Sequence, residues 1–333
     1  MTRPLISIIV PCYNHAQYLE ERFDSIFSQA CDDYELIVLD DASQDGSQDL
    51  LGQILTGKPH IFLPNMANSG SPFKQWERGL RVASGKYIWI AESDDSCASD
   101  FLSSLLAPLE RDGLSLAFSR VQTIDATSSY LETPYWPEPL NREFFRTSQI
   151  ASCRFFLQHF MGARNCFPNA SAVVFRADGF KTEILELINS VNSLKFAGDW
   201  IFWAKLLAVY GDEYMLCSAE PLCLHRMHAD TTRAALDKAG EKARICEFST
   251  AINTINLIRP AFSLGRIFRL LSSDSWDWSY AIFSQRYQPS PLEKLSGSPL
   301  HGLHRFGYIF YGLRCLNARL KMRLSHRRSV GSI

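Results

Sequence analysis

The sequence predicts an α/β fold in which helices cover both faces of a mostly parallel sheet. Over the first hundred residues, short apolar runs rich in Ile and Val alternate with longer stretches whose apolar residues recur at helical spacing. The short runs are almost continuously apolar, which is typical of strands buried on both faces. Polar residues follow these runs at their carboxyl ends, where open α/β sheets bind ligands.

The first hundred residues contain four expected strands and three expected helices. The strands are the apolar runs 5–10, 35–39, 60–63 and 87–91. The helices between them are 18–30, 47–54 and 73–83, and Ser47 is the expected N-cap of the second. This alternation predicts parallel neighbours joined by crossover connections.

The rest of the chain is expected to continue the fold and then to become mainly helical. A helix at 101–109 precedes strands at 115–118 and 171–175, and a loop rich in Pro and aromatic residues at 127–142 separates these strands. Helices follow at 178–189 and 199–209, then extended structure at 214–224 that Pro221 interrupts, and a mainly helical region from 234 onward.

The composition is that of a folded protein and argues against a nucleic-acid partner. Of 333 residues, 46% are hydrophobic and 21% are charged, and the formal net charge is −1. The nine cysteines form no C-x-x-C pair, which suits a reducing compartment better than a disulfide framework. A cytoplasmic location is expected, because no secretory signal pattern is visible and no apolar run approaches the roughly 20 residues that span a bilayer.

The carboxyl-terminal segment is basic and aromatic. Glu293 is the last acidic residue, and eight Lys and Arg residues follow it. Aromatic residues are frequent between 262 and 311. A basic helix with an apolar side can lie on an anionic membrane surface. Alternatively, the aromatic side chains pack against the rest of the protein and the basic end is a solvated tail.

Two pairs of adjacent carboxylates, Asp40-Asp41 and Asp94-Asp95, follow strands of the predicted sheet. A single pair of this kind is commonly a turn or a helix cap. Two pairs at one sheet edge are harder to explain in this way, because neighbouring carboxylates repel each other unless a cation lies among them. Mg²⁺ and Mn²⁺ bind carboxylates together with phosphate oxygens, so the pattern favours a metal-bound diphosphate.

Four motifs in this order resemble the family 2 glycosyltransferases. They are Ile6-Ser-Ile-Ile-Val-Pro-Cys-Tyr-Asn14, Glu35-Leu-Ile-Val-Leu-Asp-Asp-Ala-Ser-Gln-Asp45, Asn68-Ser-Gly70 and Ala83-Ser-Gly-Lys-Tyr-Ile-Trp-Ile-Ala-Glu-Ser-Asp-Asp95. The resemblance covers about residues 5–100 and recurs between about 165 and 232. It implies the GT-A fold, which is a Rossmann-like, mostly parallel sheet flanked by helices. It also implies a transfer that inverts the configuration at the anomeric carbon of the sugar.

The resemblance assigns roles to residues at the strand ends. Pro11 and Tyr13 would line the nucleotide pocket, and Asp41 would accept a hydrogen bond from the base. Asp94 would lie near the ribose, and Asp95 would ligate a divalent metal, Mn²⁺ or Mg²⁺, that bridges the diphosphate. Such a metal makes the diphosphate a better leaving group.

Further roles are assigned in the second half. Asp199, after a glycine at the start of a helix, would be the general base that takes the proton of the acceptor hydroxyl, although its position alone fits a helix cap equally well. In Leu224-His-Arg-Met-His228, His228 would complete the metal shell and Arg226 would contact the diphosphate. Residues 165–171 resemble a segment near the acceptor pocket, and a polar turn before a strand explains them equally well.

The predicted function is that of a metal-dependent, inverting glycosyltransferase. It would move a sugar from a nucleotide-diphosphate sugar, expected to be a UDP-sugar, to a hydroxyl of a surface polysaccharide or lipid-linked glycan. Residues 1–232 would form the GT-A catalytic domain, with a nucleotide-binding half at 1–100 and an acceptor-binding half at 101–232. Residues 233–333 would form a helical, basic and aromatic extension that could hold the protein peripherally at the cytoplasmic face of a membrane.

Two alternatives stay open at this point. A metal-dependent nucleotidyltransferase of similar α/β fold would also need paired carboxylates, but Pro11-Cys-Tyr-Asn14 is not the Gly-rich, basic loop typical of such enzymes. A catalytically silent module that binds sugar nucleotides or a membrane surface is the other alternative. The presence of Asp95, Asp199 and His228 argues against it.

Overall fold

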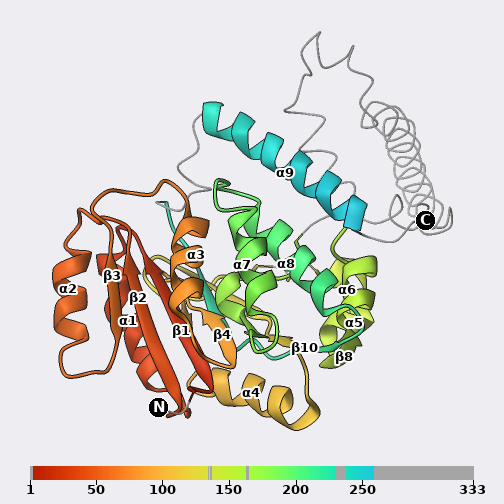
Figure 1. The fold of residues 1–333 in the computed structure, drawn as a ribbon, viewed down its shortest axis with the longest axis horizontal. Helices are drawn as coiled ribbons and strands as arrows, with labels where there is room; N and C mark the ends of the chain where they lie inside the picture. Colours follow the sequence, from red (N-terminus) through yellow and green to blue (C-terminus); the bar gives the residue numbers. More distant parts are fainter. Residues whose placement is uncertain (1–2, 134, 136, 163–164, 230–237, 259–333) are drawn as a thin grey trace, which may run out of the picture. The chain divides into compact units, whose positions relative to one another are not determined.

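A computed structural model describes residues 3–133, 135, 137–162, 165–229 and 238–258 of the chain. Its centre is a sheet of eight strands in the order β3-β2-β1-β4-β9-β6-β10-β8, with helices on both faces (Figure 1). A smaller sheet has three strands in the order β5-β11-β7. The predicted α/β architecture is therefore confirmed.

The N-terminal half shows the predicted alternation of strands and helices. Its strands are β1 (Ile6–Cys12), β2 (Tyr34–Asp40), β3 (Ile61–Pro64) and β4 (Tyr87–Ile90). Its helices are α1 (Ala16–Phe27), α2 (Ser47–Ile54) and α3 (Pro72–Val82). β1 pairs in parallel with β2 and β4, and β2 pairs in parallel with β3, so the carboxyl ends of these four strands lie at one edge of the sheet.

Strands and helices alternate less regularly in the second half of the chain. Its strands are β5 (Ser96–Cys97), β6 (Leu116–Phe118), β7 (Val121–Asp125), β8 (Gln149–Ser152), β9 (Val173–Arg176), β10 (Tyr214–Cys217) and β11 (Cys223–Met227). Its helices are α4 (Phe101–Asp112), α5 (Arg142–Arg146), α6 (Cys153–His159), α7 (Lys181–Asn189), α8 (Gly198–Tyr210) and α9 (Lys238–Ile258). Two short 3₁₀ turns, η1 (Glu138–Leu140) and η2 (Ala170–Ala172), complete it. Because β9 runs antiparallel to β4 and β6, the sheet is mixed at its centre.

Some local predictions differ from the structure. The segment 127–142, expected to be a loop, contains η1 and the start of α5. The strands β7 and β8 and the helix α6 were not predicted, because each is short and carries no clear apolar period. The N-cap of α2 is Gly46 rather than Ser47, because the chain there takes a φ of 88°, which glycine adopts readily.

The two faces of the sheet carry separate hydrophobic cores. Ile8 and Val10 of β1 belong to the core formed with α1, α2 and α4, whereas Ile9 between them belongs to the core formed with α3, α7 and α8. Successive side chains of a strand point to opposite faces, so burial on both sides explains the apolar run that predicted β1.

Gly85, in the turn before β4, allows the chain to pass close to β1. A Cβ at this position would lie 2.5 Å from the backbone N of Ser7. Gly85→Ala is therefore expected to lower the free energy of unfolding by about 3 kcal/mol. In the control Gly52→Ala, a Cβ on α2 meets nothing within 4 Å. Gly52→Ala is expected to raise the free energy of unfolding by about 0.5–1 kcal/mol, because alanine is the better helix former. Urea unfolding measures both, and equal stability of the two variants would contradict the close approach.

The C-terminal extension is described only in part. α9 is helical, as predicted beyond residue 234, and its Ala251 and Ile255 join the core that contains α8. The boundary expected at 232 and the segment 259–333, with its predicted membrane-surface role, lie outside the described residues. None of the helices in the described ranges has the length and apolar character that a bilayer crossing needs.

Candidate active site

The residues that follow β1, β2 and β4 meet at the carboxyl edge of the sheet, as predicted. After β1, Asn14 has a φ of 54° and donates from its backbone N to Oγ of Ser43, which follows β2, at 2.9 Å. His15 Nδ1 lies 2.8 Å from Oγ of Ser93, which follows β4. Hydrogen bonds thus join three segments that are far apart in the sequence.

A pocket of about 590 Å³ opens at the turn between β1 and α1. Its lining residues are Tyr13, Asn14, His15, Ala16, Gln17, Gln44 and Asp45. Two bonds fix its walls together: Gln44 N donates to Asn14 Oδ1 at 2.8 Å, and Ala16 N donates to Asp45 Oδ2 at 2.9 Å. Polar groups and one exposed aromatic ring, Tyr13, therefore surround a preformed space.

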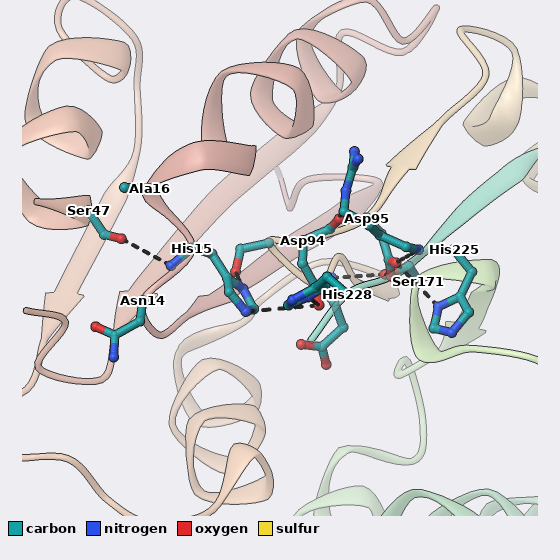
Figure 2. A network of polar contacts seen from close by, with 12 residues as sticks. Asn14, His15, Ala16, Ser47, Asp94, Asp95, Ser171, His225 and His228 are labelled. Carbon is teal, nitrogen blue, oxygen red and sulfur yellow. Dashed lines mark hydrogen bonds and ion pairs between the residues drawn. The ribbon is translucent and has the colours of Figure 1, made fainter. Parts of the chain in front are cut away.

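Asp94, His15 and His228 form a cluster of potential metal ligands (Figure 2). One ligand atom from each residue lies within 4.8 Å of the other two. Asp94 Oδ2 is 3.1 Å from His228 Nε2 and 3.9 Å from His15 Nε2. The side chain of His228 is 2% exposed, and its Nδ1 has no hydrogen-bond partner within the described part of the chain. Because His15 also lines the pocket, the cluster and the pocket are continuous.

The surroundings of Asp94 favour its ionised form. Burial would raise the pKa of Asp94, but the hydrogen bond with His228 and the charges of His15 and His225 lower it to about 2. Glu92, two residues earlier, behaves oppositely, because burial and the charge of Asp94 raise its pKa to about 8. At neutral pH, Asp94 is therefore ionised and Glu92 is largely protonated.

Asp95, predicted as the metal ligand, accepts hydrogen bonds from within the protein. Its side chain is 2% exposed. Oδ1 accepts from the backbone N of Arg226 at 3.0 Å, and Oδ2 accepts from Asn169 Nδ2 at 2.7 Å and Ser171 Oγ at 2.6 Å. Both oxygens are thus engaged in joining three segments, and Asp94 is the carboxylate beside the histidines.

Arg226, predicted to contact the diphosphate, is buried with 1% of its surface exposed. Its Nε donates to the carbonyl of Asp94 at 2.7 Å, Nη1 donates to Ser128 Oγ at 2.8 Å, and Nη2 donates to Glu21 Oε2 at 2.6 Å. All three nitrogens are engaged with protein acceptors, and the contact with the diphosphate stays a prediction. The guanidinium group holds the backbone of the Asp94 turn in place.

The remaining residues predicted to bind the nucleotide differ in their positions. Tyr13 lines the pocket and is 45% exposed. Pro11 is buried within β1. Asp41 is 4% exposed and accepts from Ser69 N at 2.9 Å, Ser69 Oγ at 2.8 Å and Gln75 Nε2 at 2.7 Å. Asp41 therefore organises the Asn68-Ser-Gly70 loop rather than facing the pocket.

Asp199 lies in the first turn of α8 and is connected to the same edge of the sheet. Asn165 Nδ2 donates to Asp199 Oδ2 at 2.9 Å, and Asn169, four residues later, donates to Asp95. The N-cap residue of α8 is Ala197, so Asp199 is not the cap of this helix. The segment 165–171 therefore links Asp199 to the turn that carries Asp94 and Asp95.

The backbone before Asp199 is held by α9. Glu247 Oε2 accepts from the backbone N of Phe196 at 2.7 Å and of Ala197 at 3.1 Å. On the other side, a Cβ on Gly198 would lie 2.5 Å from the ring of Phe73 in α3. The start of α8 is thus fixed from two directions.

Sequence reasoning did not single out His15, Gln44 or Asp45. His15 directly follows the Pro11-Cys-Tyr-Asn14 motif. Polar residues just beyond a strand of a parallel sheet fall at its ligand-binding edge, and this rule could have pointed to His15. Its closeness to Asp94 and His228 could not have been read from the sequence, because the three residues lie on separate segments.

The fold of this chain is shared with solved glycosyltransferases. S. aureus TarS in complex with UDP-GlcNAc has a TM-score of 0.57, and the match covers 92% of this chain and 87% of TarS 1–349. The mannosyltransferase PcManGT from Pyrobaculum calidifontis, in complex with GDP-Man and Mn²⁺, has a TM-score of 0.50 over 96% of this chain and 88% of that protein. Each is 17% identical to this chain. The chain therefore has the GT-A fold of these proteins.

The chain belongs to the family described as glycosyl transferase family 2. The profile of this family matches residues 7–187, which is more than half of the 333 residues. The predicted family, the predicted GT-A fold and the prediction of an enzyme are therefore confirmed.

Curated relatives are also glycosyltransferases by name. An uncharacterized glycosyltransferase of Nostoc sp. is 24% identical over 67% of this chain and 65% of its own length. The putative teichuronic acid biosynthesis glycosyltransferase TuaG of Bacillus subtilis is 31% identical over 31% of this chain and 41% of its own length. The poly(ribitol-phosphate) beta-glucosyltransferase of Bacillus spizizenii is 35% identical over 29% of this chain and 16% of its own length. The matched segment spans less than two thirds of each of these relatives.

Proposed function

We propose that the protein transfers a sugar, with inversion, from a UDP-sugar to a hydroxyl group of a growing glycan. The observation that carries this proposal is the ionised Asp94, held beside two histidines at the margin of a pocket of about 590 Å³. A nucleotide in the pocket would bring its diphosphate to this cluster. The family supplies the reaction class, and the site supplies the residues.

Asp94 and His228 would hold the divalent ion, in place of the Asp95 expected from the sequence. Asp94 offers an ionised carboxylate, and His228 is buried beside it, whereas both oxygens of Asp95 are engaged elsewhere. One carboxylate and one imidazole are suitable ligands for Mn²⁺. Mg²⁺ would be the alternative ion, with a stronger preference for oxygen ligands. The ion, when bound, would neutralise charge on the diphosphate leaving group.

The nucleoside would occupy the pocket that the β1–α1 and β2–α2 turns line. Tyr13 offers an exposed aromatic ring for stacking against a base, and Asn14 and Gln44 offer polar groups. Pro11 and Asp41 would support this wall from within the protein, without contacting the base. The complexes of TarS with UDP and UDP-GlcNAc support uridine as the nucleoside, while the GDP-Man complex of PcManGT is the competing precedent.

Asp199 would act as the general base. It would take the proton of the acceptor hydroxyl while the hydroxyl oxygen forms a bond to C1 of the sugar. The bond from C1 to the diphosphate oxygen would break, and the diphosphate would leave with the electron pair. Attack opposite the leaving group inverts the configuration without a covalent intermediate. Asn165 Nδ2, at 2.9 Å from Asp199 Oδ2, would orient the carboxylate.

The acceptor would be a polysaccharide or a lipid-linked glycan. The names of TuaG and of the Pasteurella multocida chondroitin synthase, which is 27% identical over 44% of this chain, support a glycan acceptor. A peripheral position at the cytoplasmic face of a membrane is proposed from the basic segment after Glu293, which lies outside the described residues.

Binding of nucleotide sugars tests the proposal. The full chain is heated with UDP-glucose, UDP-GlcNAc or GDP-mannose, each with and without Mn²⁺, and the unfolding temperature is recorded. A ligand at a hundred times its Kd stabilises the folded state by about 2.7 kcal/mol, so a rise of several degrees is expected for a UDP-sugar with Mn²⁺. Tyr13→Ala should reduce this rise. A larger rise in the unfolding temperature with GDP-mannose would make guanine the nucleobase that the pocket prefers. No rise with any of the three nucleotide sugars would contradict the proposal.

A further inference from the structure

His15 is not part of the two-residue metal site proposed above, yet its ring is oriented toward that site. His15 Nδ1 lies 2.8 Å from Ser93 Oγ. The tautomer with the proton on Nδ1 donates to this hydroxyl and leaves the lone pair of Nε2 on the side of Asp94, whose Oδ2 is 3.9 Å away. A hydrogen bond from the second ring nitrogen is the usual way in which metal-binding histidines are oriented.

The backbone of His15 is also fixed without a ligand. Its N donates to Ser47 Oγ at 3.3 Å, and the neighbouring Ala16 N donates to Asp45 Oδ2 at 2.9 Å. The ring packs edge-on against Tyr18 and His228, with centroids 5.9 and 5.6 Å apart. Figure 2 shows the His15 and His228 side chains together with Asp94.

The distances within the cluster are those of a site that a small ion can draw together. Ligand atoms at about 2.1 Å from a shared ion lie about 3.0–3.4 Å apart at common coordination angles. The separation of 3.1 Å between Asp94 Oδ2 and His228 Nε2 already has this value. The separation of 3.9 Å to His15 Nε2 is longer by less than 1 Å, which side-chain rotation can close.

We infer that His15, Asp94 and His228 together form a three-ligand site that takes a first-row transition ion such as Mn²⁺ before the nucleotide arrives, and that binds Mg²⁺ much more weakly. Two imidazoles and one carboxylate favour such ions, whereas Mg²⁺ prefers oxygen ligands and loses its water reluctantly. The inference rests on the proposed function, in which an ion accompanies the diphosphate. It adds the third ligand, the order of binding and the choice of ion.

A direct consequence follows for the pocket. His15 is both a wall of the pocket and a ligand of the site, so an ion would join the turn before α1 to the segments after β4 and β11. Three protein ligands leave further coordination positions open, and diphosphate oxygens could fill them.

Metal titration without any nucleotide tests the inference. Free Mn²⁺ is measured by electron paramagnetic resonance as the full chain is added, and Mg²⁺ is then used as the competitor. Mn²⁺ is expected to bind at least about tenfold more tightly than Mg²⁺. His15→Phe keeps a planar ring but removes the ligand, and it should weaken Mn²⁺ binding by at least about tenfold. His15→Asp replaces a nitrogen ligand by an oxygen ligand. It should therefore reduce the ratio of the Mn²⁺ affinity to the Mg²⁺ affinity.

The matched control is His159→Phe. His159 is an exposed histidine at the end of α6 whose Nδ1 contacts the carbonyl of Phe155, and it lies outside the three-residue cluster, so Mn²⁺ affinity should stay within about threefold. Thermal unfolding confirms that each variant folds. If His15→Phe does not fold, the ratio of Mn²⁺ to Mg²⁺ affinity in His15→Asp still tests the inference. Unchanged Mn²⁺ affinity in His15→Phe, equal affinities for Mn²⁺ and Mg²⁺, or no binding of Mn²⁺ alone would each overturn the inference. If UDP-sugar binding with metal persists in that case, the proposed function stands, and the error lies in the third ligand, the order of binding or the choice of ion.

Discussion

Replacing Asp95 by alanine is expected to lower the free energy of unfolding by about 3–5 kcal/mol, because several donors would lose the acceptor that they share. The carboxylate accepts from Arg226 N, Asn169 Nδ2 and Ser171 Oγ within 3.0 Å and is 2% exposed. In the variant the buried Arg226 N and Ser171 Oγ would lose this acceptor, and the contacts from the end of β4 to β11 and to the segment before β9 would weaken. Urea unfolding followed by fluorescence measures the loss.

Asp94→Asn is the matched comparison for this prediction. Asp94 is adjacent in sequence but partly exposed, and its side-chain contacts are with His228 and His15. Its replacement should cost clearly less stability than Asp95→Ala, while Mn²⁺ binding should fall by at least about tenfold. The reverse pattern, in which Asp95→Ala remains stable but loses metal, would restore Asp95 as the ligand and refute the assignment to Asp94.

The contrast between these two aspartates shows how far the sequence could predict the site. The motif and the strand ending at Ile90 predicted that a carboxylate would lie at the ligand edge of the sheet. Which of two adjacent carboxylates faces the ligand depends on partners elsewhere. Asn169 is 74 residues from Asp95, and nothing in the local sequence indicates that it would hold that side chain.

Arg226 also shows that partners distant in the sequence limit what can be predicted. A guanidinium group beside a predicted diphosphate is a reasonable contact, because arginine offers several donors to phosphate. In the structure these donors are used by acceptors such as Glu21, which is 205 residues away in the sequence. By contrast, the first four strands were predictable because each is a short apolar run and its burial depends only on helices that the adjacent sequence also encodes.

Asp199→Asn is expected to remove sugar transfer and to leave binding of the donor intact. The amide has nearly the same size and can still contact Asn165, but it cannot accept the proton of the attacking hydroxyl. General-base catalysis contributes about 10²–10⁴-fold, so kcat should fall by a factor in this range. Because Asp199 lies on α8 and the pocket is lined by residues of the β1–α1 and β2–α2 turns, the Kd for a UDP-sugar with Mn²⁺ should change less than about twofold. Calorimetry gives the Kd, and release of UDP in the presence of acceptor gives kcat.

Asp212→Asn is the control for this variant. Asp212 follows the other end of α8, where it is paired with Arg154 and has a side chain that is 80% exposed. The same chemical change at that position should leave both kcat and Kd unaltered, because an exposed ion pair contributes little. If Asp199→Asn keeps turnover within about fivefold of the unmodified protein, another group must take the proton. A large rise in the donor Kd with normal turnover at saturation would instead make Asp199 a donor-binding residue.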